Sequence, residues 1–156
     1  MVTHRVVLGG AAAAVGSGVA AHRLASGLPT APAVFVSPHQ DDELLSMGAA
    51  IMEHVALGRD VRVLLIGRGN KSAVRTSQAL FELIGYVPTE GEFGGVRDRE
   101  FQWSVSTLGA ARVLPTWADR LDENAFTAGA VAAIIKKFVP AGSDLKTLTK
   151  HGDEYH

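Results

Sequence analysis

The sequence predicts an α/β fold in which a mostly parallel sheet lies between layers of helices. Two short runs, residues 33–37 and 61–66, are almost continuously apolar, which is typical of strands that are buried on both faces. Longer segments, in which apolar residues recur at helical spacing, lie between and after these runs. Strands that alternate with helices favour a parallel sheet with right-handed crossovers. With 156 residues, the chain is expected to form one domain.

The strands and helices of the first half of the chain have the clearest sequence patterns. After strand 33–37, small and apolar residues return at helical spacing until a stop at Gly58. These residues are Leu44, Gly48, Ile51 and Val55. Strand 61–66 follows, and then an apolar stripe that ends at Gly85. The stripe consists of Ala79, Leu80, Leu83 and Ile84, and it predicts a second helix.

The second half of the chain continues the alternation with weaker patterns. A helix is expected over residues 100–108, and a short strand over residues 112–114. The segment 128–138 predicts a helix that is closed by Pro140. Residues 145–148 predict one more strand, which would bring the histidines after it to an edge of the sheet.

The first 25 residues resemble a targeting segment rather than part of the domain. His4 and Arg5 precede residues 6–21, which are small, apolar and uncharged. This layout is typical of a signal peptide or an N-terminal anchor, although a buried first helix would also fit. Residues 26–32 are then a linker to the domain. We expect a secreted or cell-envelope protein, or a cytoplasmic one if the leader does not function.

Composition excludes several classes of function. A formal net charge of −1 and few aromatic residues (6%) give no basis for nucleic-acid binding. The chain has no cysteine, so a metal site must use histidine and carboxylate ligands. No stable membrane span is expected beyond the leader, and the sequence does not indicate an oligomeric state.

The candidate functional site is the hexapeptide Pro-His-Gln-Asp-Asp-Glu at residues 38–43, between the first strand and its helix. Parallel strands deliver such residues to the carboxyl edge of the sheet, where α/β proteins bind ligands. One imidazole and three carboxylates lie within five residues there. Neighbouring carboxylates repel one another, and a divalent cation would relieve that repulsion.

The spacing suggests a division of roles among these side chains. His39 and Asp42 are three residues apart, so a turn brings them to the same side, and imidazole with carboxylate suits zinc best. Asp41 would project beside the metal, where it could accept a proton from a zinc-activated water. Glu43 would lie in the first helical turn as structural support.

Two other interpretations of the cluster remain open. The acidic residues could be an ordinary helix cap, with His39 as a bystander. They could also hold magnesium in a phosphohydrolase, although magnesium prefers ligands that are all oxygen and would leave His39 without a role.

The same residues resemble the Ala/Pro-His-Pro-Asp-Asp-Glu signature of the PIG-L superfamily, also called LmbE-like. Four other segments are similar to that family, and with the signature the resemblance covers roughly residues 33–156. They are residues 61–70, 97–100, 108–109 and 152–156. Gln40 stands where the family usually has proline, and we expect little effect from that change. The resemblance implies a three-layer Rossmann-like fold and a zinc-dependent hydrolase that removes the N-acetyl group from N-acetylglucosamine conjugates, which are small molecules or glycoconjugates.

The resemblance also implies roles for individual residues. His39 and Asp42 match metal ligands, Asp41 matches the general base, Arg97 matches an arginine that contacts substrate, and His156 matches a histidine that assists the transition state. The histidine that provides the family's third zinc ligand has no counterpart in this chain, and neither do the family's last strands and helix. The deacetylase domain of residues 33–156 is therefore expected to be partial, with an incomplete sheet. A truncated, catalytically inactive remnant of the same fold is the alternative.

Overall fold

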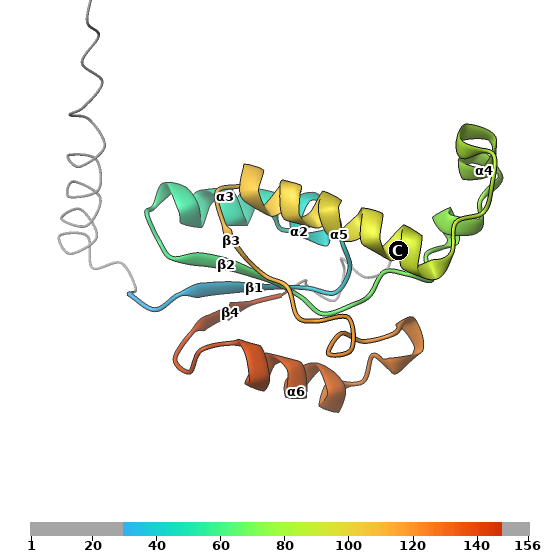
Figure 1. Cartoon of the computed structure of the whole chain (residues 1–156). Coiled ribbons are helices and arrows are strands. Elements are labelled where there is room, and N and C mark those ends of the chain that lie inside the picture. The colour runs from blue at the N-terminus through green and yellow to red at the C-terminus, as the bar shows by residue number, and fades with distance from the viewer. Residues whose placement is uncertain (1–29, 148–156) are drawn as a thin grey trace, which may run out of the picture.

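Four parallel strands form the sheet in the computed structural model, which describes residues 30–147 (Figure 1). They are β1 (Ala33–Ser37), β2 (Val61–Leu65), β3 (Ala111–Val113) and β4 (Asp144–Lys146). Their order in the sheet is β3-β2-β1-β4. The chain thus moves outward from β1 to β2 and β3, and then returns to the other side of β1. This reversal makes the carboxyl end of β1 the switch point at which open α/β sheets bind ligands.

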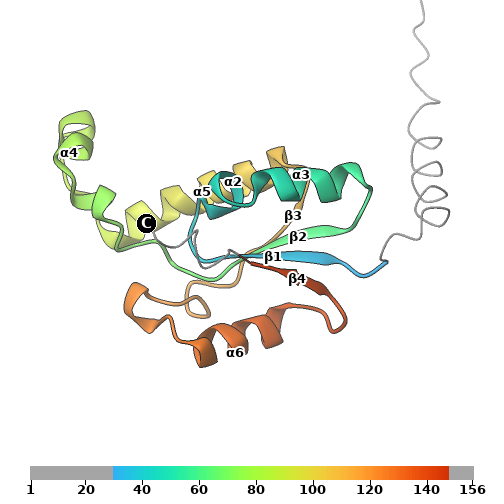
Figure 2. The ribbon, with the colours of Figure 1, turned by 180° about the vertical axis from the view of Figure 1, so that it is seen from behind.

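Helices cover both faces of the sheet, which confirms the predicted three-layer α/β fold (Figures 1 and 2). One face is covered by α2 (Asp42–Leu45), α3 (Gly48–Ala56) and α5 (Glu90–Thr107). The opposite face is covered by α6 (Ala128–Phe138). Three shorter helices lie in the connections: η1 (Ala73–Thr76), α4 (Gln78–Ile84) and η2 (Glu123–Ala125). None of the helices in residues 30–147 has both the length and the apolar character needed to cross a membrane.

Each face of the sheet has its own hydrophobic core, because side chains alternate along a strand. From β1, Ala33 and Phe35 point into the layer of α3 and α5, whereas Val34 and Val36 point toward α6. Both strands at the centre of the sheet are buried almost along their whole length. This burial explains why the sequences of β1 and β2 are almost continuously apolar.

Two of the predicted helices have other bounds in the structure. The helix after β1 is interrupted and forms two pieces, α2 and α3. Helix α5 starts at Glu90 rather than at residue 100. A reciprocal capping box fixes this earlier start: the Thr89 hydroxyl accepts a hydrogen bond from the Glu92 N–H (3.2 Å), and the Glu92 carboxylate accepts one from the Thr89 N–H (2.8 Å). Three glycines in the first turns of α5 hide the helical pattern in the sequence.

Helix α4 was predicted from its apolar stripe, but it packs on neither core. None of its residues is buried, and Leu83 is 80% exposed. Figures 1 and 2 show α4 standing beyond the end of α5, away from the sheet. The predicted helix is thus present, but its apolar side chains are not covered by either core and need another explanation.

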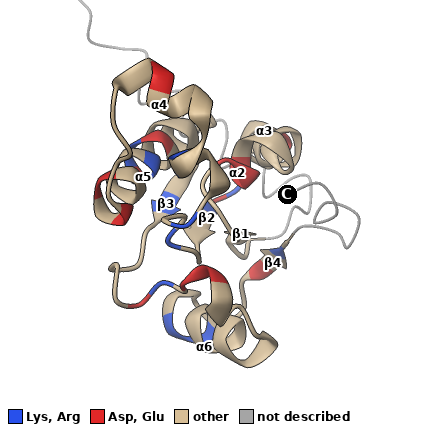
Figure 3. Cartoon of the chain, turned by 90° about the vertical axis from the view of Figure 1, so that its right-hand side faces the viewer, with Lys and Arg blue, Asp and Glu red and all other residues tan. Residues whose placement is uncertain are grey.

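Charged side chains of both signs are mixed over the helices and strands in the side view of Figure 3. The predicted leader, most of the predicted linker, and His151 and His156 lie outside the described residues. The predicted strand at 145–148 corresponds to β4, which starts one residue earlier.

Candidate functional site

The loop that carries the candidate site leaves β1 at the carboxyl edge of the sheet and enters α2 at Asp42. The adjacent strand holds it by its backbone: Gly67 N–H donates to the carbonyl oxygen of Pro38 (2.8 Å). A Cβ at Gly67 would lie 2.4 Å from that oxygen, so only glycine permits this close approach. At the start of the loop, the Ser37 hydroxyl donates to the carbonyl oxygen of His39 (2.8 Å).

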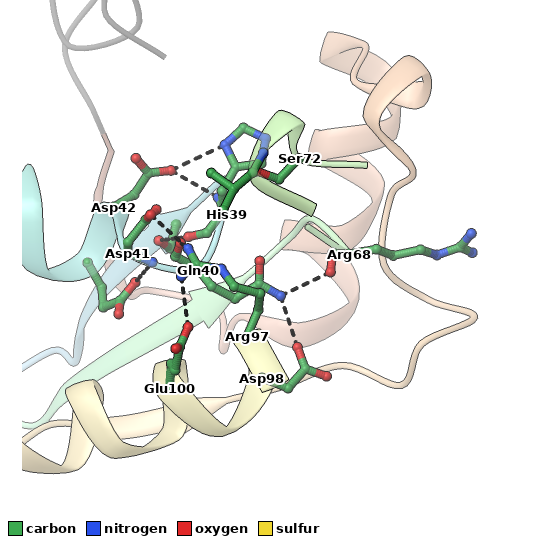
Figure 4. Close-up of polar contacts among 12 residues, drawn as sticks. His39, Gln40, Asp41, Asp42, Arg68, Ser72, Arg97, Asp98 and Glu100 are labelled. Atoms are coloured by element: carbon green, nitrogen blue, oxygen red, sulfur yellow. Dashed lines mark hydrogen bonds and ion pairs between the residues drawn. The ribbon is translucent and has the colours of Figure 1, made fainter. Parts of the chain in front are cut away.

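The structure brings His39 and Asp42 together, as their spacing predicted (Figure 4). The Asp42 carboxylate accepts a hydrogen bond from the His39 N–H (2.9 Å) and lies 3.4 Å from His39 Nδ1. On the other side of the ring, His39 Nε2 is 3.2 Å from Glu123 Oε1. The hydrogen bond to Asp42 raises the pKa of His39, and the charge of Glu123 adds to that rise, while burial opposes it. Glu123 was not identified from the sequence.

Asp41 has an uncommon backbone conformation, with φ at 106°. It is the one residue other than glycine with a positive φ in the described part of the chain. Its side chain turns away from Asp42 and accepts a hydrogen bond from Arg97 Nη2 (2.7 Å). Two neighbouring aspartates therefore point in different directions. Backbone strain of this kind is often found at functional sites.

Glu43 holds the backbone of Asp41 by a hydrogen bond. Its carboxylate accepts the N–H of Asp41 (2.9 Å), and its side chain is buried. Burial raises the pKa of Glu43, while the hydrogen bond from the Asp41 N–H opposes the rise. The sequence interpretation of Glu43 as structural support agrees with this position.

Gln40 is the anchor that the sequence did not reveal. Its side chain is buried, and its amide donates to the carbonyl oxygen of Arg68 (3.0 Å) and to Asp98 Oδ1 (2.9 Å). Asp98 in turn pairs with the buried Arg120 through two contacts of 2.6 Å. Gly69 makes room for Gln40, since a Cβ at that position would lie 1.9 Å from the glutamine oxygen. These partners are distant in sequence, so no local spacing indicated them.

Arg97, predicted to contact substrate, lies at the site but is bound to the loop itself. It donates to the carbonyl oxygen of Gln40, to Asp41 Oδ2 and, through Nη1, to Glu100 Oε2 (2.8 Å). Its side chain is 25% exposed. Arg97 therefore orients Asp41 and remains partly exposed at the wall of the cleft described next.

These side chains line a cleft of about 380 Å³, large enough for a small molecule. Its walls include His39, Asp41, Asp42 and Arg97, together with Lys71 from the connection after β2. Charged and polar side chains converge in this cleft, which we call the polar cleft and which suits a hydroxylated or amide-containing ligand.

The described residues do not form a complete metal site. No group of three or more histidine, cysteine, aspartate or glutamate side chains in residues 30–147 is arranged to hold a metal ion. A catalytic zinc ion usually has three protein ligands, of which His39 and Asp42 could provide two. His156, expected to act on the transition state, lies outside the described residues and cannot be placed relative to them.

Comparison with known proteins identifies one family. The sequence model of PIG-L, described as GlcNAc-PI de-N-acetylase, matches residues 34–155. No curated protein sequence matches the chain. Among solved structures, the 4-carboxy-2-hydroxymuconate hydratase GalB of Pseudomonas putida KT2440 is 24% identical, with a TM-score of 0.46. The similarity covers 60% of this chain and 38% of the hydratase, so the chain spans well under half of that protein.

Proposed function

Because the chain belongs to the PIG-L family, which indicates a deacetylase-like hydrolase, we propose that it hydrolyses the N-acetyl amide of an N-acetylglucosamine-type conjugate. The observation that carries this proposal is the divergence of two adjacent aspartates. Asp42 turns toward His39, whereas Asp41 turns toward Arg97 and the cleft. An ordinary acidic helix cap would not need this arrangement, and Asp41 makes no side-chain hydrogen bond to the helix N-terminus.

Zinc is the cofactor that we propose, held by His39 and Asp42 and by a donor beyond the described residues. Imidazole nitrogen and carboxylate oxygen are typical zinc ligands. When bound, such an ion lowers the pKa of water to about 7 and polarises a carbonyl group.

The remaining chemistry belongs to side chains of this protein. Asp41 accepts a proton from the attacking water at its carboxylate and returns it to the departing amine, so that the products are an amine and acetate. Arg97 holds that carboxylate in place through its 2.7 Å contact. We propose that His156, as an imidazolium, donates a hydrogen bond to the carbonyl oxygen as negative charge develops on it.

The test is the Asp41→Asn variant of the full chain, assayed for hydrolysis of N-acetylglucosamine conjugates and for bound zinc. Asparagine tolerates a positive φ well, so the loop should keep its shape. Hydrolysis should fall by about 10²- to 10⁴-fold, while zinc stoichiometry should stay unchanged. His39→Ala should instead lose zinc. Asp60→Asn, at the opposite edge of the sheet, is the matched control and should change neither quantity.

Two outcomes would overturn the assignment. If Asp41→Asn lost zinc, the division of roles between Asp41 and Asp42 would be wrong. If the purified chain bound magnesium rather than zinc, the phosphohydrolase interpretation would replace the deacetylase.

We also propose that residues 1–25 direct export, on the basis of their uncharged apolar run. Secretion of a reporter fused to these residues is the measurement. Retention of the reporter in the cytoplasm would contradict the proposal.

A further inference from the structure

A second hollow adjoins the polar cleft and has more apolar walls. Its volume is about 430 Å³, and its walls are mainly apolar. They come from two helices and the segment that joins them. The principal apolar residues are Leu80 and Ile84 of α4, Tyr86 and Pro88 of the connection, and Phe93 and Val96 of α5. We refer to this hollow as the apolar pocket.

The apolar pocket and the polar cleft meet at the candidate catalytic residue. Asp41, Arg97, Ser72 and Val74 line both hollows. A ligand that reaches the Asp41 carboxylate from the polar cleft is therefore directly at the mouth of the apolar pocket. This continuity makes the two hollows parts of one binding site.

The charged groups at the pocket already have partners. The Glu92 carboxylate is used in the cap of α5, where it accepts from Thr89 (2.8 Å). The Glu100 carboxylate accepts from Arg97 (2.8 Å). What the pocket offers a ligand is therefore mainly hydrocarbon surface, and an apolar group would gain affinity there by leaving water.

The pocket also explains helix α4. This helix packs on neither core of the protein, yet Leu80 and Ile84 line the pocket while Leu83, which does not, is 80% exposed. Exposed apolar surface that is continuous with a polar cleft is typical of a ligand-binding groove. A ligand would cover the two lining residues.

We propose that the apolar pocket holds the acyl chain of the substrate, so that this protein removes acyl groups longer than acetyl. The inference rests on the proposed function and changes only the acid that is released. In an amide, the acyl chain is bonded directly to the carbon that water attacks, whereas an aglycone lies across the sugar ring from it. Since the pocket opens directly at Asp41, the directly bonded chain is the part that fits, and the polar cleft receives the hydroxylated amine.

The experiment measures Kd and hydrolysis for methyl glycosides of N-acetyl-, N-butanoyl-, N-hexanoyl- and N-octanoyl-glucosamine with the full chain. Octyl N-acetylglucosaminide is included to place the same hydrocarbon on the aglycone instead. Affinity should rise about two- to fourfold for each added methylene, since a fully buried methylene gives about fourfold and the pocket is open on one side. The octyl glycoside should show no comparable gain.

Matched variants on one helix test the location. Ile84→Ser should flatten the dependence of affinity on acyl length. Leu83→Ser, its neighbour outside the pocket, should leave the whole series unchanged. Val96→Phe, on the other wall, should shift the preference to shorter chains by filling the space. Far-UV circular dichroism checks that each variant is folded.

The outcomes separate this inference from the proposed function. Equal affinity for all acyl lengths would overturn the acyl pocket even if the N-acetyl compound is hydrolysed. A gain for the octyl glycoside alone would also overturn it, because the pocket would then hold an aglycone. Rising affinity that Ile84→Ser abolishes would support the pocket even if no compound is hydrolysed, and in that case only the proposed function would fail.

Discussion

The Asp98→Asn substitution tests the network that anchors the loop of residues 38–41. The Arg120 guanidinium is only 3% exposed, and both of its terminal nitrogens lie 2.6 Å from Asp98 oxygens. Asp98 Oδ1 also accepts the Gln40 amide (2.9 Å). Asparagine has nearly the same shape as aspartate, so no cavity forms. The change removes the negative charge and turns one acceptor into a donor that faces the guanidinium.

The expected loss of stability follows from the buried cation. Leaving one member of a buried ion pair without its partner costs about 3–5 kcal/mol. Arg120 also lies over the Trp117 ring, 5.1 Å from its centroid, and that contact remains in the variant. We therefore expect the lower end, about 3 kcal/mol, which corresponds to a fall in Tm of about 10 °C for a domain of this size.

Urea unfolding followed by far-UV circular dichroism measures the free energy of unfolding. Asp98→Asn, Arg120→Met and the double variant complete a double-mutant cycle, with a coupling energy of about 2 kcal/mol or more expected. Asp60→Asn, in an exposed pair with Arg62, is the control and should stay within about 0.5 kcal/mol of the parent. A loss below about 1 kcal/mol for Asp98→Asn, or additive single effects, would refute the reasoning.

Three further predictions concern other parts of the fold. Gly69→Ala should destabilise the protein by about 1–3 kcal/mol and lower the rate of hydrolysis. The reason is that Gly69 has a φ of +64° and that a Cβ there would meet the Gln40 amide. Unchanged activity would contradict this prediction. Burial lowers the pKa of His54 in the folded protein, and the charge of Arg59 lowers it further. The unfolded chain therefore binds a proton at this histidine more readily than the folded protein does, so the free energy of unfolding should fall as the pH drops below the usual histidine range. His54→Asn should flatten that dependence in urea melts at pH 5 to 8, and an equally steep profile would contradict the cause. Phe101→Ala should lose about 4 kcal/mol in the same melts, because this residue of α5 is 1% exposed and lies in the core between the helix and the sheet. A loss under about 1 kcal/mol would contradict its core role.

The parts of the fold that the sequence predicted well are those with a dense local signal. Strand β1 and helix α6 occupy the predicted residues, 33–37 and 128–138. Each has apolar residues in an uninterrupted pattern and a clear stop. The pairing of His39 with Asp42 was predictable for a similar reason, since a single turn determines which residues three apart can meet.

The sequence was less informative where a local residue pattern does not reveal what a side chain faces in the fold. The apolar stripe of α4 predicted a helix but not its position, which is beyond the sheet, where it lines the apolar pocket. His54 is a polar residue of the amphipathic helix α3, yet its ring packs edge-on against Phe35 and its Nδ1 lies 3.1 Å from Arg59. A periodicity shows which side of a helix is apolar, and it does not show what that side faces.

Gln40 shows why the candidate site could not be completed from its own loop. We expected little effect where glutamine replaces the proline of the family signature, yet this side chain connects the loop to Asp98, which lies 58 positions further along the chain. Proline stiffens a loop through its own ring, whereas glutamine can do so only through partners that the fold brings to it. The strained backbone of Asp41 is thus held by contacts from α5, namely Arg97 on its carboxylate and Asp98 on the residue before it. The site therefore depends on a helix whose first half was not predicted, and a change in α5 should disturb Asp41 even though the signature itself stays intact.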